Sequence, residues 1–147
     1  MWQGVTAVQM NPYLSFQGDC EEAFAFYEHC LDGRVGSIFR YAGTPMVGHV
    51  PADWSDKIMH GSLTIGGQVL MGADVTPDQY EQPKGFSLSL QIKDTAEAER
   101  IFGDLGKGGE VLMPLEKTFW AERFGMLVDR FGIPWMINCE GPDQSQE

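Results

Sequence analysis

The sequence predicts an α+β fold built from two βαβββ modules, and three observations lead to this prediction. Two segments carry helix signals, and each is flanked by segments whose side chains alternate as in β-strands. The pattern Asp-x-x-Glu-Ala starts at Asp19 and again at Asp94, a shift of 94 − 19 = 75 residues. The pattern Gly-x-Leu starts at Gly61 and again at Gly125. Agreement of order and type in both halves favours an internal repeat over chance.

The first module is predicted to span residues 8–78. A strand over 13–16 precedes a helix that begins after Asp19, the expected N-cap, and ends at Gly33. Its apolar stripe follows helical spacing and comprises Ala23, Phe26, Tyr27, Cys30 and Leu31. Further strands are expected over 35–41, 59–65 and 68–73, the last two joined by a Gly-Gly turn.

The second module is predicted to span residues 84–140. Residues 86–92 alternate strictly and predict a strand with Phe86 on the helix side. Asp94 is the expected N-cap of a second helix, which Gly106 ends. Strands follow over 109–113, 125–128 and 135–139.

Composition excludes several classes of function. The 147 residues are 43% hydrophobic and 21% charged, as in a globular domain, and the net charge is 10 − 21 = −11. Such a charge disfavours nucleic acid and anionic membranes as partners. No apolar run is long enough to span a bilayer, and no signal peptide is visible at the N-terminus. Three widely spaced cysteines fit reduced thiols, so we expect a cytoplasmic protein.

Three motifs carry a resemblance to a known family. They are Tyr13-Leu14-Ser15-Phe16-x-Gly18-x-x-Glu21-Glu22-Ala23-x-x-Phe26-Tyr27; Ile58-Met59-His60-Gly61 with Leu70-Met71-Gly72-Ala73-Asp74; and Phe119-Trp120-x-x-Arg123-Phe124-Gly125-x-x-x-Asp129-x-Phe131-Gly132-x-x-Trp135. Together they resemble the PhnB-like branch of the vicinal oxygen chelate superfamily, which has the glyoxalase/bleomycin-resistance fold. The resemblance implies a single domain over 1–147, in which two curved mixed or antiparallel sheets form a cup with the helices outside. It also implies a small-molecule ligand and a homodimer.

Members of this branch are often labelled demethylubiquinone methyltransferases. The sequence gives that label little support, because no glycine-rich turn for a methyl-donor nucleotide follows a strand.

Strand alternation assigns the candidate site. On the third strand His60, Ser62 and Thr64 lie opposite the apolar side chains and are expected to face the cup. His60 is the candidate catalytic base, because histidine titrates near neutrality. The alternative is a structural histidine bonded to a neighbouring carbonyl or carboxylate. The candidate ligand-binding residues are Ser62, Met71, Asp74, Ser87, Trp120, Phe124 and Met136.

Several of these positions keep alternative interpretations. Asp74 could orient His60 or a substrate, or be a solvated turn residue. Trp120, Phe124 and Trp135 could wall an apolar pocket or be core. Arg123 could hold an anion or form a surface ion pair. Cys20 lies near a helix start, which lowers a thiol pKa.

The family's metal positions, as the resemblance implies, fall on Asn11 or Pro12, on Met71, on Ser87 and on Met136. Methionine and serine are poor ligands for Mg²⁺, Mn²⁺ or Zn²⁺. We therefore predict no metal at these positions and no cofactor. Two function classes remain: an enzyme of lyase or isomerase type that uses His60, and a protein that sequesters a small molecule without catalysis.

Overall fold

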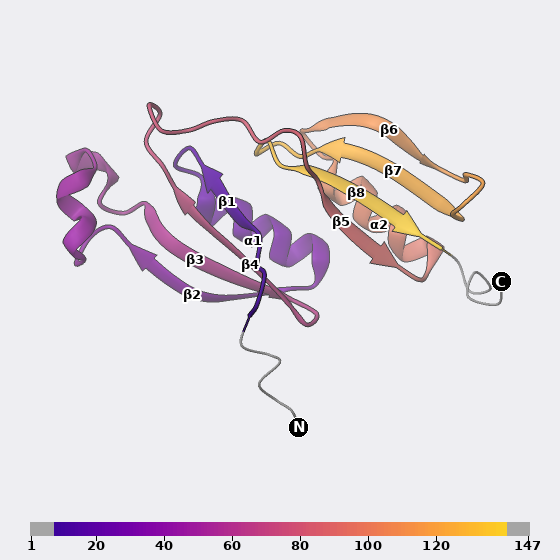
Figure 1. Ribbon diagram of the computed structural model, residues 1–147, viewed down its shortest axis with the longest axis horizontal. Helices are drawn as coiled ribbons and strands as arrows, with labels where there is room; N and C mark the ends of the chain where they lie inside the picture. The colour runs from indigo at the N-terminus through magenta and orange to yellow at the C-terminus, as the bar shows by residue number, and fades with distance from the viewer. Residues whose placement is uncertain (1–7, 141–147) are drawn as a thin grey trace, which may run out of the picture. The chain divides into compact units, whose positions relative to one another are not determined.

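The computed structural model describes residues 8–140. The chain forms two compact units, and the boundary in the sequence falls between Tyr80 and Glu81. Each unit contains one α-helix and a four-stranded mixed sheet, in the chain order β, α, β, β, β (Figure 1). This architecture confirms the α+β fold of two βαβββ modules. Within the described residues, no helix is both long and apolar enough to cross a membrane.

The first unit is a sheet with the strand order β1-β4-β3-β2, covered on one face by α1. Its elements are β1 (Tyr13–Phe16), α1 (Cys20–Leu31), β2 (Arg34–Arg40), β3 (Ile58–Ile65) and β4 (Gln68–Asp74). β1 pairs with β4 in parallel, and the other pairs are antiparallel. Two 3-10 turns, Pro45–His49 and Ala52–Trp54, lie between β2 and β3.

The buried face of α1 is rotated from its predicted position. Phe24, which the predicted stripe omitted, is 1% exposed, whereas Phe26 is only half-buried. Gly61 on β3 lies under the Phe24 ring, and a Cβ atom there would make an ordinary contact of 3.5 Å with it. At the matching position of the second unit the fit is tighter, because a Cβ atom on Gly125 would lie 2.7 Å from the Phe102 ring. Packing of the helix on the sheet therefore requires glycine at position 125.

Both ends of α1 differ from their predictions. Asp19 makes no side-chain cap bond, and its place is taken by Asp74 of β4, whose Oδ1 accepts the N–H groups of Gly18 and Cys20. At the other end Asp32, with φ 55°, adopts the left-handed conformation that was expected of Gly33. The N-terminus of α1 is thus capped by Asp74, a residue distant in sequence.

The second unit repeats this arrangement with the strand order β5-β8-β7-β6. Its elements are β5 (Leu88–Ile92), α2 (Thr95–Leu105), β6 (Glu110–Glu116), β7 (Arg123–Val128) and β8 (Pro134–Cys139). The prediction for α2 is confirmed, since the Asp94 carboxylate accepts the Glu97 N–H at 2.9 Å and Gly106 follows the helix. The prediction for Phe86 is wrong, because this residue precedes β5 and is 50% exposed.

Candidate functional site

His60 lies on the face of the first sheet that α1 leaves open. Its Nδ1 is 3.2 Å from the hydroxyl of Tyr13 on β1. The imidazole also lies near two aromatic rings, with centroid distances of 5.7 Å to Tyr13 and 6.5 Å to Phe39 on β2. Both rings are about half exposed, so His60 is flanked by an accessible aromatic surface. Its partner is therefore a phenol, and not the carbonyl or carboxylate expected for a structural histidine.

Ser62 and Met71 occupy the same open face, as their predicted roles require. They are register partners on β3 and β4, and Met71 is also the partner of Tyr13 on β1. Ser62 has a structural task as well, because its Oγ accepts the N–H of Ser37 at 3.0 Å where β2 departs from regular register. The hydroxyl thereby stabilises an irregular edge strand.

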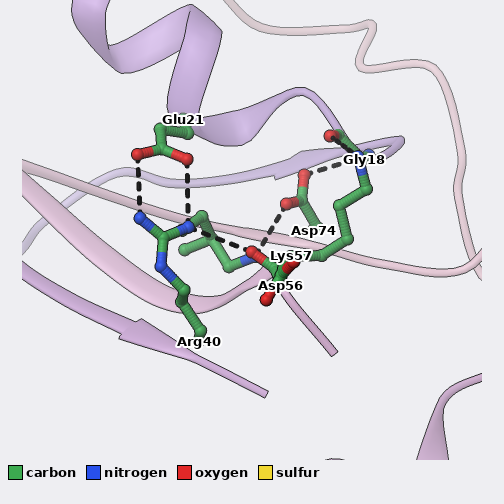
Figure 2. Close-up of a pocket in the computed structure, with 7 residues that line it drawn as sticks. Gly18, Glu21, Arg40, Asp56, Lys57 and Asp74 are labelled. Atoms are coloured by element: carbon green, nitrogen blue, oxygen red, sulfur yellow. Dashed lines mark hydrogen bonds and ion pairs between the residues drawn. The ribbon is translucent and has the colours of Figure 1, made fainter. Parts of the chain in front are cut away.

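Asp74 is neither a solvated turn residue nor a partner of His60. Its side chain is 1% exposed, and its two oxygens accept three backbone N–H groups, of which that of Gly18 is labelled in Figure 2. Oδ1 takes those of Gly18 and Cys20, both at 2.9 Å, and Oδ2 takes that of Ile58 at 2.8 Å. Burial of a carboxylate is tolerated when hydrogen bonds of this kind compensate for lost water. Asp74 therefore joins the start of α1 to the start of β3.

A polar pocket of about 390 Å³ lies beside this carboxylate. Arg40 binds both carboxylate oxygens of Glu21 at 3.0 and 2.9 Å, which lowers the pKa of Glu21. Lys57 donates to the Gly18 carbonyl at 2.9 Å (Figure 2). The cations of this pocket are already engaged by the protein, so we interpret it as a structural junction.

A second pocket, of about 470 Å³, opens on the second unit. Its walls are largely apolar and include Phe86, Leu112, Val128 and Met136. Ser87 and Lys84 also line it, and Lys84 forms no ion pair with any residue in 8–140. Two predicted ligand-binding residues, Ser87 and Met136, are thus brought together in one cavity. Phe86 precedes β5 and does not pack under α2, so its side chain is able to line this pocket.

The predicted aromatic wall is only partly formed. Trp120 is 42% exposed and packs edge-on against Phe124 with ring centroids 5.3 Å apart. Trp135 does not belong to this wall, because it is 2% exposed in the core. Arg123 forms a 3.2 Å ion pair with Glu99, as expected for a surface residue in an acidic protein.

The four family metal positions can now be placed. Asn11 donates its side-chain N–H to the Val69 carbonyl. Met71 lies on β4, where it is the register partner of Ser62 on β3. Ser87 and Met136 line the apolar pocket. Across residues 8–140, no group of three or more His, Cys, Asp or Glu side chains could hold a metal ion. The predicted absence of metal at these positions stays a prediction.

The position of Cys20 at the helix start does not lower the pKa of its thiol. Burial raises the pKa of this thiol far above its usual range, and the neighbouring Asp74 and Asp19 raise it further. Cys20, Cys30 and Cys139 are all buried, and they form no disulfide with one another. Burial, with the nearby carboxylates added to it, therefore opposes formation of a thiolate at Cys20.

Sequence reasoning missed two partners at these sites. Tyr13 was assigned only to a strand, although it supplies the hydroxyl beside His60. Asn138 lies two residues beyond Met136 on β8 and bonds Gln91 on β5 at 2.8 Å. Alternation along β8 would have placed Asn138 on the same face as Met136.

Comparison with a known structure supports the fold. A glyoxylase/bleomycin resistance protein/dioxygenase domain from Frankia sp. EAN1pec matches with a TM-score of 0.63 over 91% of this chain and 98% of that chain. It is only 12% identical, so the likeness shows the fold alone. The predicted glyoxalase-like fold is thereby confirmed.

The chain belongs to the 3-demethylubiquinone-9 3-methyltransferase family, whose model matches residues 8–138. Protein PA1353 from Pseudomonas aeruginosa is 47% identical, with a TM-score of 0.83 over 92% of this chain and 100% of that chain. A putative 3-demethylubiquinone-9 3-methyltransferase, PhnB protein, from Bacillus cereus is 26% identical, with a TM-score of 0.77 over 90% and 99%. The PhnB-like resemblance is confirmed. The N–H of Gly18, the glycine between β1 and α1, is bonded to Asp74, so this turn is built as a helix cap.

Proposed function

We propose that this protein binds a small organic molecule on the open face of its second unit. The supporting observation is the pocket of about 470 Å³ with its largely apolar walls. Its volume and its apolar lining fall within the range of small-molecule sites. Exposed apolar side chains such as Phe86 and Leu112 cost free energy in water, and a ligand that covers them recovers it.

The pocket is expected to bind the uncharged fluorescent probe N-phenylnaphthylamine, with one site per chain and a blue-shifted emission. Leu112→Arg should weaken binding at least about tenfold, because it places a charge on an apolar wall, where desolvation is unfavourable. Leu112 is 53% exposed on the edge strand β6, so the variant should fold.

The matched control is Val111→Arg, since Val111 is 49% exposed on the same strand but approaches Gly106 of the helix side. Equal loss of probe binding in both variants, or no saturable binding by the unmodified protein, would contradict the pocket as a ligand site.

A second candidate function is catalysis by His60, favoured by its contact with Tyr13. Because Nδ1 of His60 is hydrogen-bonded to the Tyr13 hydroxyl, Nε2 is the ring nitrogen that can exchange a proton with a ligand. Burial raises the pKa of Tyr13, with a smaller contribution from Cys20, so its hydroxyl keeps its proton at neutral pH. The pair could serve as the acid–base group of a lyase or isomerase reaction.

Mass spectrometry of a small-molecule extract incubated with the protein tests this candidate. If His60 is the base, His60→Ala should abolish a conversion that Thr64→Ala, a change on the same strand face, leaves intact. Tyr13→Phe should slow the conversion about 10²-fold or less, as expected for a supporting proton donor. A conversion that survives in His60→Ala excludes the residue as base.

We further propose a cytoplasmic homodimer. The buried cysteines, which form no disulfide with one another, support a reducing compartment. The exposed apolar residues of β6, among them Leu112 and Met113, support association. Light scattering that gives the monomer mass of 16.4 kDa at micromolar concentration would refute the dimer.

A further inference from the structure

Three uncharged polar side chains form a hydrogen-bonded row on the open face of the second sheet. Gln91 Nε2 donates to Ser89 Oγ at 3.0 Å, and Asn138 Nδ2 donates to Gln91 Oε1 at 2.8 Å. We name Ser89, Gln91 and Asn138 the amide row. Asn138 alternates with the buried Trp135 and Ile137 of β8, and Gln91 of β5 is its register partner, so the row lies on the side away from α2.

The amide row has an unused acceptor. Asn138 Oδ1 is buried and has no hydrogen-bond partner among the described residues. Buried acceptors in folded proteins are nearly always paired. A donor supplied to Asn138 by a bound molecule would relieve this deficit. Asn138 itself is half-buried, and a small change of its broad χ2 torsion, which keeps the bond from Nδ2 to Gln91, can open the oxygen to a ligand.

Strand register places the amide row beside the apolar pocket. Ser89 is the β-partner of Met136, which lines the pocket, and Gln91 is the partner of Asn138. Asn138 therefore lies roughly 7 Å along β8 from Met136, two residues at strand rise. On the other side, Asn138 is the partner of Phe124, against which Trp120 packs.

We propose that this face recognises an uncharged aromatic molecule that carries an amide-like head group. The inference rests on the proposed ligand pocket and adds the chemical class of its ligand. The apolar body of the molecule occupies the pocket at Met136, and its head group donates an N–H to Asn138 Oδ1. The carbonyl of an amide head also matches the Ser89 hydroxyl, whose proton is free because its oxygen accepts from Gln91.

Charge selects against an acidic head group at this place. None of the three side chains in the amide row is charged, and a carboxylate cannot donate to an acceptor oxygen. Lys84, the cation that lines the pocket, precedes β5, whereas Gln91 is near the end of that strand. A net charge of −11 adds a general repulsion of anions.

Calorimetric titrations with naphthalene carboxamide and the isosteric naphthalene carboxylate test the inference. We expect the amide to bind about tenfold more tightly to the unmodified protein, the value of roughly one or two hydrogen bonds. Asn138→Leu and Gln91→Leu should each reduce this preference to less than about threefold. Asn11→Leu, which removes an amide from the first unit, is the matched control and should leave the preference unchanged.

The outcomes separate this inference from the proposed pocket. Equal affinity for both probes, with loss of both in Leu112→Arg, would leave the pocket standing and overturn the amide-like head group. A preference that persists in both Asn138→Leu and Gln91→Leu would also overturn it. If neither probe binds the unmodified protein, both the pocket and its ligand class are wrong. Gln91 is exposed, so its variant remains informative even if Asn138→Leu does not fold.

Discussion

Asp74→Ala is expected to lower the free energy of unfolding of the first unit by more than about 3 kcal/mol. The carboxylate is 1% exposed and accepts the N–H groups of Gly18, Cys20 and Ile58. Alanine leaves all three donors without an acceptor, and each buried unsatisfied group costs about 1–3 kcal/mol. That loss is large beside a typical domain stability of about 5–15 kcal/mol.

Hydrogen exchange detected by mass spectrometry gives the sharpest readout. In the variant, the amides of Gly18, Cys20 and Ile58 should exchange faster than those elsewhere in the unit, because their acceptor has gone. Urea unfolding followed by circular dichroism reports the free energy itself. Asp53→Ala, which removes an exposed aspartate from the turn before β3, is the control and should change stability by less than about 0.5 kcal/mol. A loss below about 1 kcal/mol in Asp74→Ala would contradict the anchoring role.

Asp74 also shows where sequence reasoning stopped. Local spacing placed the cap of α2 correctly, because Asp94 and Glu97 lie three residues apart in the same turn. The same spacing failed at α1, where the cap comes from β4, more than fifty residues along the chain. A carboxylate at the end of a strand has no local signal that separates a helix anchor from a ligand contact.

In the candidate site, too, local patterns predicted which face a side chain occupies but not which distant residue it contacts. Alternation put His60 and Ser62 on the open face correctly, because strand side chains have a period of two. It could not pair His60 with Tyr13, since that contact depends on β1 lying beside β4 in parallel register. Met136 was identified from the family resemblance, whereas the cavity around it depends on the chain segment before β5.

Asp129 stands in the third of the sequence motifs, Phe119 to Trp135, and the structure gives that motif a physical reason. Its Oδ1 accepts the N–H groups of Phe131 at 2.8 Å and Ile133 at 3.1 Å. Its Oδ2 accepts the indole N–H of Trp135 at 2.8 Å. One buried carboxylate therefore fixes both the turn between β7 and β8 and the large aromatic side chain that follows it.

We expect Asp129→Ala to lower the free energy of unfolding of the second unit by about 3–5 kcal/mol, because it leaves three buried donors without their acceptor and each costs about 1–3 kcal/mol. Asp94→Ala is the matched comparison in the same unit, because Asp94 is exposed and accepts a single N–H. Its loss should be about 1 kcal/mol, as for an ordinary helix cap. Urea unfolding of the two variants gives both values.

A double-mutant cycle separates the indole from the turn. Trp135→Phe removes the N–H that Oδ2 accepts while it keeps an aromatic ring in the core. The cycle of Asp129→Ala with Trp135→Phe should show a coupling of about 1–3 kcal/mol, as for residues in direct contact. If the two losses simply add, the carboxylate acts through the turn alone and the proposed anchoring of Trp135 is wrong. If Asp129→Ala lowers the free energy of unfolding no more than Asp94→Ala does, Asp129 does not anchor the second unit.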